Sequence, residues 1–228
     1  MTSLLPAIVV ALISGVIAAA AVGPLLRRVP EPQLEPDEEK LRYAALATAR
    51  TAAACLLWAT ALAFVAAARV PFATLAPWLV LAVCGAIAAV IDIATTWIPR
   101  SLCHGAWALA ALATLASAAT LPAWPDALRA AIGAAGSGGL FWLVYEVAVR
   151  GERHLFGFAD VRLAFLAGAV AAWHSWSTLA SGLLLGTLIG AVWGVVTAIV
   201  RRRDAAFPYG PSIVLGPFAA LLVGLLSG

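Results

Sequence analysis

Two aspartates at the edges of separate apolar segments are the residues whose type and placement could do chemistry. Asp160 lies in the stretch Gly157-Phe158-Ala159-Asp160-Val161-Arg162-Leu163, where two small residues let backbone come close to its carboxylate. Asp92 lies 68 residues upstream, at the end of another apolar run, and is the only acidic residue between Glu39 and Asp126. An ionisable group at membrane depth is costly and is by default a functional-site hypothesis. Two such carboxylates, each at the edge of a different apolar segment, predict that Asp92 and Asp160 act as a pair.

A pair of carboxylates supports general acid–base chemistry. Two carboxylates a few ångströms apart cannot easily both ionise, so one of them keeps a proton. The ionised member can take a proton from water while the protonated member donates to a substrate carbonyl, which gives amide hydrolysis without a covalent intermediate. A site at the membrane edge has the water that this reaction needs.

Structural roles for the same acidic residues stay open at this point. Asp160 could cap the helix that follows it, and Asp92 could pair with Arg100. Glu146 stands four residues before Arg150, a spacing that favours an ion pair on one helix. A small transporter or channel using Asp92 and Glu146 as proton or cation sites is the alternative function. The acidic residues gather at one face and no inverted repeat of broken helices is visible, which disfavours a transporter.

Composition places the chain in a membrane. Hydrophobic residues make up 64% of the 228 residues and charged residues 11%, whereas soluble domains carry about 25% charge. At about 20 residues per span, the chain has room for eight spans and no large soluble domain. We therefore expect residues 1–228 to form one polytopic all-α bundle of about eight transmembrane helices. The apolar runs cover 4–26, 44–68, 74–98, 101–121, 130–149, 161–176, 178–200 and 211–227.

The distribution of basic residues predicts how the bundle is oriented. With eight spans, twelve of the fourteen basic residues fall in or beside alternate loops, and only Arg69 and Arg129 fall on the other side. By the positive-inside rule these loops, beginning with 27–43, are cytoplasmic and both termini lie outside. Asp92 and Asp160 then meet at the cytoplasmic face. We expect a multi-pass protein of the plasma (inner) membrane, with membrane lipid and no nucleic acid as a partner.

Cysteine and glycine patterns indicate structural roles. The three cysteines, Cys55, Cys84 and Cys103, lie in or beside apolar runs, and none has a metal-ligand spacing such as Cys-x-x-Cys. The glycines at 182, 186, 190 and 194 repeat every four residues, a pattern that allows close helix packing in lipid.

Three motifs resemble those of the prepilin peptidases, also called type IV leader peptidases. Residues 157–163 resemble the family's Gly-x-Gly-Asp motif, which is commonly followed by Val-Lys-Leu. The segment from Asp92 to Pro99 resembles its first catalytic motif, an Asp followed seven residues later by Pro. The tail Pro208-Tyr209-Gly210-Pro211 is similar to its C-terminal Pro-x-Gly-Pro motif. The motifs follow one another in the family's order and cover most of the chain.

The resemblance implies an aspartic endopeptidase of the GxGD class. Such enzymes remove the short basic leader from prepilin or pilin-like precursors at the cytoplasmic membrane face. It implies Asp92 and Asp160 as the catalytic pair, and the remaining motif residues as their support: Gly157, Ala159, Arg162, Pro99, Pro208, Gly210 and Pro211.

This sequence also departs from the family pattern. Ala159 stands where the second motif glycine is usual, which leaves an inactive homologue serving as an assembly scaffold as a further alternative. Arg162 replaces the usual Lys and keeps its charge. Many members carry zinc-type cysteine pairs in the first cytoplasmic loop, but 27–43 has no cysteine, so we expect no metal and no other cofactor. No feature indicates whether the chain also N-methylates its product with S-adenosylmethionine.

Overall fold

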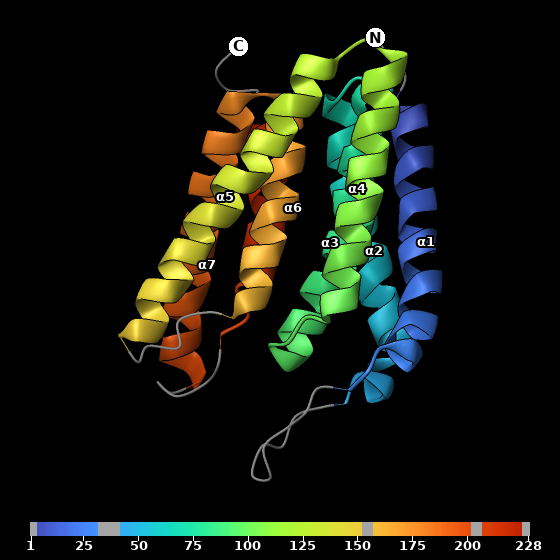
Figure 1. Cartoon of the computed structure of the whole chain (residues 1–228). Coiled ribbons are helices and arrows are strands. Elements are labelled where there is room, and N and C mark those ends of the chain that lie inside the picture. Colours follow the sequence, from blue (N-terminus) through green and yellow to red (C-terminus); the bar gives the residue numbers. More distant parts are fainter. Residues whose placement is uncertain (1–3, 32–41, 152–156, 202–206, 225–228) are drawn as a thin grey trace.

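The computed structural model describes residues 4–31, 42–151, 157–201 and 207–224, and this part of the chain is helical throughout, without a strand. The helices lie alongside one another in a bundle (Figure 1). The all-α prediction is confirmed. The α-helices are α1 (Leu5–Arg28), α2 (Ala49–Arg69), α3 (Ala76–Thr95), α4 (Arg100–Thr120), α5 (Trp124–Arg150), α6 (Phe158–His174), α7 (Trp176–Arg201) and α8 (Gly210–Val223), with short 3₁₀ turns η1 (Tyr43–Leu46) and η2 (Phe72–Thr74).

Six of these helices, α1 to α5 and α7, are long and apolar enough to cross a membrane. This confirms the prediction of a polytopic membrane protein. The other two, α6 and α8, have 17 and 14 residues. At 1.5 Å per residue they are about 26 and 21 Å long, shorter than a hydrocarbon core of about 30 Å. Helix α8 is apolar, and most residues of both helices are buried against the rest of the bundle.

The centre of the bundle is made of α3, α6 and α8. Buried residues form most of each of these helices, 11 of the 17 residues in α6 among them. Helices α3 and α8 approach closely at Gly85, where a Cβ atom would lie 2.8 Å from a methyl carbon of Val214. The two helices that carry Asp92 and Asp160 are therefore core helices, held on several sides.

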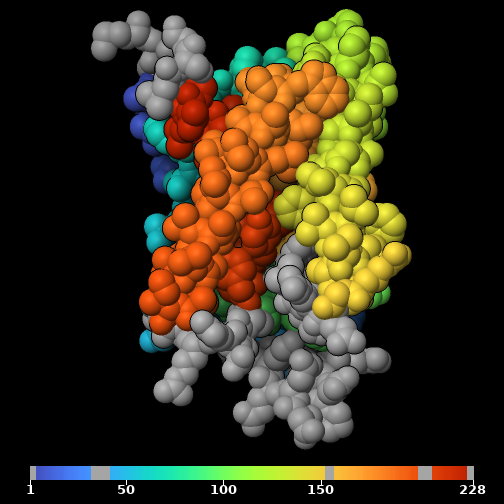
Figure 2. All heavy atoms as spheres, turned by 90° about the vertical axis from the view of Figure 1, so that its left-hand side faces the viewer, coloured from blue at the N-terminus to red at the C-terminus, as the bar shows by residue number. Residues whose placement is uncertain are grey.

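The glycine repeat of α7 packs against α8. A Cβ atom at Gly182 would lie 3.2 Å from the Cα atom of Pro217, and one at Gly186 would lie 3.0 Å from the carbonyl oxygen of Ser212. Only glycine lets the two backbones come this close, so the predicted packing role is confirmed. Figure 2 shows α7, in orange, covering much of α8, in red.

Polar contacts in and beside the apolar bundle fix α6 to α5. The hydroxyl oxygen of Ser137 on α5 lies 2.8 Å from the carbonyl oxygen of Ala164 on α6. At the other end of α6, the guanidinium of Arg129 donates to the carbonyl of Trp173 over 2.7 Å and is paired with Asp126 over the same distance. Because it satisfies C-terminal carbonyls, Arg129 acts as a cap for α6.

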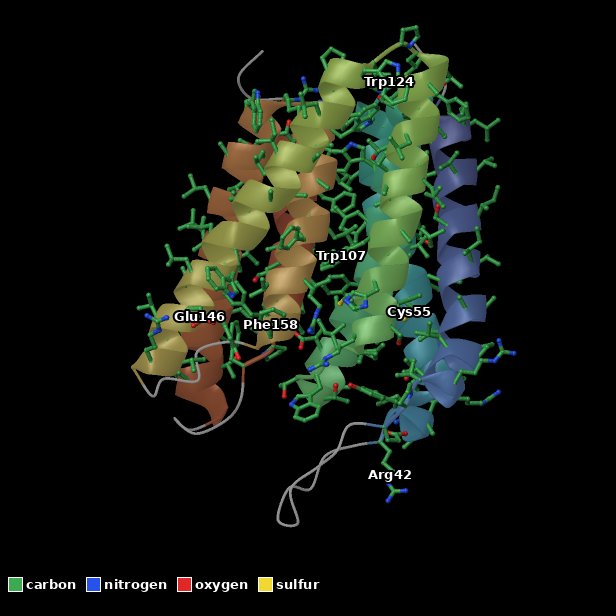
Figure 3. The ribbon with its side chains drawn as sticks, viewed as in Figure 1. Arg42, Cys55, Trp107, Trp124, Glu146 and Phe158 are labelled. Carbon is green, nitrogen blue, oxygen red and sulfur yellow. The ribbon has the colours of Figure 1, made fainter. Side chains whose placement is uncertain are left out.

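The start of α1 and the end of α8 lie at the same end of the bundle (Figure 1). Trp124 lies at that end, whereas Arg42, Glu146 and Phe158 lie at the opposite end (Figure 3). A chain that crosses the membrane an even number of times begins and ends on the same side.

Reporter fusions test the orientation of this bundle. We expect reporters inserted between residues 30 and 38, or after Arg203, to read as cytoplasmic, because the basic residues gather on that side. Reporters beside Pro125 or after Gly228 should read as outside. A cytoplasmic signal from the Pro125 fusion would contradict the predicted orientation.

Candidate active site

Asp92 lies in the last turn of α3 and is almost fully buried, with 3% of its surface exposed. Its Oδ2 atom accepts a hydrogen bond of 2.9 Å from the backbone N–H of Gly210, 118 residues further along the chain. Among the described residues it forms no ion pair with Arg100. The geometry therefore disfavours the alternative in which Asp92 forms an ion pair with Arg100.

The chain after Asp92 turns sharply so that α4 can begin at Arg100. Thr96 ends α3 in the left-handed conformation with φ 57°, and its N–H donates to the carbonyl of Asp92 over 2.7 Å. The hydroxyl of Thr95 accepts from the N–H of Trp97 over 3.1 Å, which tightens the turn. Pro99 then stands just before the first helical residue of α4. Asp92 and Pro99 are thus the two ends of one compact connection.

Asp160 is the third residue of α6 rather than the residue before it, because this helix begins at Phe158. The helix predicted from the apolar run 161–176 therefore starts too late. Its Oδ2 atom accepts from the N–H of Gly157 over 2.9 Å, and 5% of the residue is exposed. This contact is the carboxylate half of a capping box. The capping role considered for Asp160 is therefore present, and it leaves the other carboxylate oxygen for a second role.

The two carboxylates are near enough to repel each other electrostatically. The thiol of Cys103, on the first turn of α4, lies within electrostatic range of Asp92, Asp160 and Arg162. Cys103 is 2% exposed, so its thiol is buried near these groups. Its local sequence predicts only an ordinary buried thiol and does not mark it as a neighbour of both aspartates.

The segment before α8 completes the surroundings of the aspartates. A Cβ atom at Gly210 would lie 2.8 Å from Oδ2 of Asp92, so only glycine fits there. The ring of Tyr209 packs against Gly190 of α7, and its hydroxyl lies within electrostatic range of Asp160. Pro208 is buried, and Pro211 lies in the first turn of α8, where a missing N–H costs nothing.

A groove of about 730 Å³ is lined by residues on either side of Asp160 and by the turn that follows α3, although neither Asp92 nor Asp160 is part of its lining. Its volume is within the range of about 300–1,000 Å³ that is usual for ligand sites. It runs between the end of α1, the turn from α3 to α4, and the start of α6. Its lining comprises Val29, Pro30, Tyr43, Thr96, Trp97, Ile98, Pro99, Arg100, Ser101, Gly157, Phe158, Ala159 and Arg162.

The carboxylate of Glu31 fixes one wall of this groove. It accepts hydrogen bonds from the N–H groups of Tyr43 and Ala44, over 2.9 and 3.1 Å, and so satisfies the start of η1. Burial, together with the charge of Glu31, raises the pKa of Tyr43 to about 12. The hydroxyl of Tyr43 therefore stays protonated at neutral pH and points to the carbonyl of Trp97, 3.4 Å away.

The opposite wall is held by Trp107. Its indole Nε1–H donates to the backbone carbonyl of Arg162 over 2.9 Å and so joins α4 to α6. Trp107 lies between these two helices (Figure 3). The guanidinium of Arg162 lies 4.6 Å from the centre of the Phe158 ring, in the geometry of a cation–π contact.

Other candidate groups lie outside this arrangement. Glu146 lies 3.8 Å from Arg150, which confirms the predicted ion pair. In the described part of the chain, no three His, Cys, Asp or Glu side chains gather as a metal site would require. The absence of a metal or cofactor remains a prediction.

The model of the type IV leader peptidase family matches residues 79–195, a range that contains both aspartates and the start of the groove's α6 wall. The match extends over half of the chain. This chain belongs to the type IV leader peptidase family. The resemblance seen in the motifs is confirmed.

Individual relatives are similar over shorter stretches. A prepilin leader peptidase/N-methyltransferase of Pseudomonas aeruginosa is 32% identical over 87 residues, 37% of this chain and 28% of the relative. A leader peptidase, HopD, of Salmonella typhimurium is 33% identical over 97 residues, 41% of this chain and 59% of the relative. The chain thus covers less than two thirds of the curated relatives it matches. No solved structure matches it.

Proposed function

We propose that this chain is an aspartic endopeptidase that removes the leader from prepilin or pilin-like precursors at the cytoplasmic face of the plasma (inner) membrane. The observation that carries the proposal is the position of Asp92 and Asp160. They are two buried carboxylates from different core helices, within electrostatic range of each other. The residues on either side of Asp160 line a groove of about 730 Å³.

The hydrogen bonds of the two aspartates suit a shared-proton mechanism. Each carboxylate uses Oδ2 to accept one backbone N–H, from Gly210 or from Gly157. In the described part of the chain the Oδ1 atoms make no hydrogen bond, so they can contact a water molecule and the substrate carbonyl. The ionised partner takes a proton from the water as it attacks, and the protonated partner donates to the carbonyl oxygen. The two groups then act as one unit with macroscopic rather than individual pKa values.

The alternative functions receive less support. A transporter would need Asp92 and Glu146 to serve one pathway, but Glu146 is paired with Arg150 and is partly exposed. A scaffold without activity would have no need for two buried carboxylates within electrostatic range of each other. The names of some relatives include an N-methyltransferase activity. We do not propose that activity for this chain.

Co-expression with a pilin-like precursor tests the proposal. In cells lacking their own leader peptidase, we expect the precursor to be shortened at its N-terminus, with the new end identified by mass spectrometry. An unprocessed precursor beside a well-inserted chain would contradict the peptidase function and favour the scaffold.

Substitutions of Ala159 test how closely the substrate approaches the lining of the groove. Ala159 lines the groove and is half-buried. We expect Ala159→Gly to keep or raise cleavage, and Ala159→Val to reduce it about tenfold, because a branched side chain would crowd a peptide beside Asp160. The measurement is kcat/KM on one precursor. Full activity in the valine variant would mean that no close approach occurs at this position.

A further inference from the structure

The two aspartates come from different halves of the bundle. Figure 1 shows α1 to α4 grouped on one side and α5 to α7 on the other. Asp92 is carried by α3 and Asp160 by α6, so the separation of their carboxylates depends on how the two halves are joined. One contact between the halves at this end is the hydrogen bond from Gly210, at the start of α8, to Asp92. Another is the hydrogen bond of 2.9 Å from the indole Nε1–H of Trp107 to the carbonyl of Arg162.

The hydrogen bond of Trp107 joins segments that lead directly to both aspartates. Arg162 follows Asp160 by two residues, which is about 3 Å along the axis of α6. On the other side, Trp107 belongs to α4, which begins directly after Pro99 at the end of the compact connection from Asp92. Because this connection is short and hydrogen-bonded, a displacement of α4 from α6 moves Asp92 relative to Asp160.

Side-chain packing leaves a space between α4 and its neighbours. A cavity of about 330 Å³ lies between α4, α5 and α6, and its lining comprises Trp107, Phe165 and mostly alanines of these three helices. Where small side chains leave such a space, fewer direct contacts fix the spacing of the helices. The hydrogen bond of Trp107 therefore supplies a fixed distance between α4 and α6 where packing does not.

Aromatic neighbours hold the indole of Trp107 in place. Its ring centre lies 5.3 Å from that of His104 and 5.4 Å from that of Phe165. Phe165 in turn occupies the space left by Gly138 of α5, where a Cβ atom would collide with the phenyl ring. These contacts fix the direction of the Nε1–H group, so the length of its hydrogen bond sets the spacing between α4 and α6.

We propose that Trp107 is a positioning residue for leader cleavage, and that its hydrogen bond to Arg162 sets the spacing of the two catalytic carboxylates. The inference rests on the proposed function, because it concerns the same pair. Trp107 does not line the groove, so it acts through Asp92 and Asp160 and not by contact with the substrate. Without the bond the carboxylates move apart, and their two protonation steps come closer together. The state with one shared proton then exists over a narrower pH range.

Two variants at this position remove the N–H donor. Trp107→Phe keeps an aromatic ring, and 3-benzothienylalanine at position 107 keeps the shape of the indole with sulfur in place of N–H. In each we expect kcat to fall about tenfold, below the roughly 10²-fold that a displacement of about 1 Å can cause, with KM unchanged. The pH–rate profile should narrow by about 0.5 at each limb, because coupled carboxylates are split by more than about one pKa unit. Cys103 and Tyr209, which are titratable groups in electrostatic range of the pair, and Arg162 beside Cys103 are left unchanged.

The same two substitutions at Trp173 are the matched control. The indole N–H of Trp173 donates to the carbonyl of Thr74 over 3.1 Å, so it also joins the two halves, but it lies at the other end of α6. We expect the Trp173 variants to lose as much thermal stability as the Trp107 variants. Their kcat and pH–rate profile should stay as in the wild-type chain.

Infrared titration measures the same coupling without a substrate. The band of protonated carboxyl groups is followed against pH, with the double Asp92→Asn, Asp160→Asn variant as the blank. The two protonation steps should lie closer together in the Trp107 variants than in the wild-type chain and the Trp173 variants. Wild-type kcat, pH profile and step spacing in both Trp107 variants would overturn the inference, and so would equal changes in the Trp173 variants. A step spacing that depends on Trp107 in a chain that leaves the precursor uncut would contradict the peptidase function alone.

Discussion

Asp92→Asn is expected to lower leader cleavage by about 10³-fold or more, since removal of one member of a catalytic unit costs about as much as removal of the whole unit. The side chain is buried and accepts a hydrogen bond from Gly210. Asn can keep that bond through its carbonyl oxygen but cannot hold or exchange the proton. Membrane insertion and thermal stability should therefore change little while activity is lost.

Single-turnover cleavage of a precursor by the purified variant measures this effect, with the wild-type chain prepared in the same way. Glu146→Gln is a matched control, because Glu146 is an acidic residue of the same end whose partner is Arg150. It should retain most of the activity. Comparable activity in the Asp92 and Glu146 variants would exclude Asp92 from the chemistry.

Gly210→Ala is expected to cost about 10²-fold in kcat, the size of loss that a displacement of about 1 Å can cause at a reacting group. The added Cβ atom would lie 2.8 Å from Oδ2 of Asp92 and 3.0 Å from a methyl carbon of Leu163. Both contacts are too short, so the carboxylate or the start of α8 must move. The hydrogen bond that holds Asp92 lengthens with either movement.

Gly105→Ala provides the comparison for this substitution. Gly105 lies one turn into α4, near the same end of the bundle, and a Cβ atom there would meet nothing within 4 Å. It should keep kcat within about twofold, as surface substitutions usually do. Equal kcat values for the two alanine variants would show that the contact between Gly210 and Asp92 does not position the carboxylate.

The fold was largely predictable because apolar runs of membrane length can hardly be anything but helices. The boundaries were less predictable. The apolar run expected at 130–149 starts too late, because α5 begins at Trp124 and Pro125 lies in its first turn, where proline is well tolerated. The start of α6 was placed after Asp160, because an acidic residue beside an apolar run looks like the end of that run. The carboxylate instead caps the helix from within.

The two aspartates were found because charge stands out against an apolar sequence. Cys103, Tyr43 and Trp107 were missed because they are neutral residues in apolar or aromatic surroundings. Their roles come from contacts between distant segments, such as the hydrogen bond from Trp107 to Arg162, 55 residues away. Local sequence carries no signal for such a contact. Only the packing of α4 against α6 brings it about.

Leader cleavage by the Asp160→Asn chain tests the catalytic pair most directly, because it separates the two roles that Asp160 can have. As a helix cap, Asn serves about as well as Asp, so the contact with Gly157 and the insertion of the chain should persist. As a member of the pair, Asn cannot share the proton. We expect a well-inserted protein that leaves the precursor uncut, and a double Asp92→Asn, Asp160→Asn variant that is no worse. Near-normal cleavage by the Asp160→Asn chain would contradict the paired-aspartate mechanism and leave Asp160 as a cap alone.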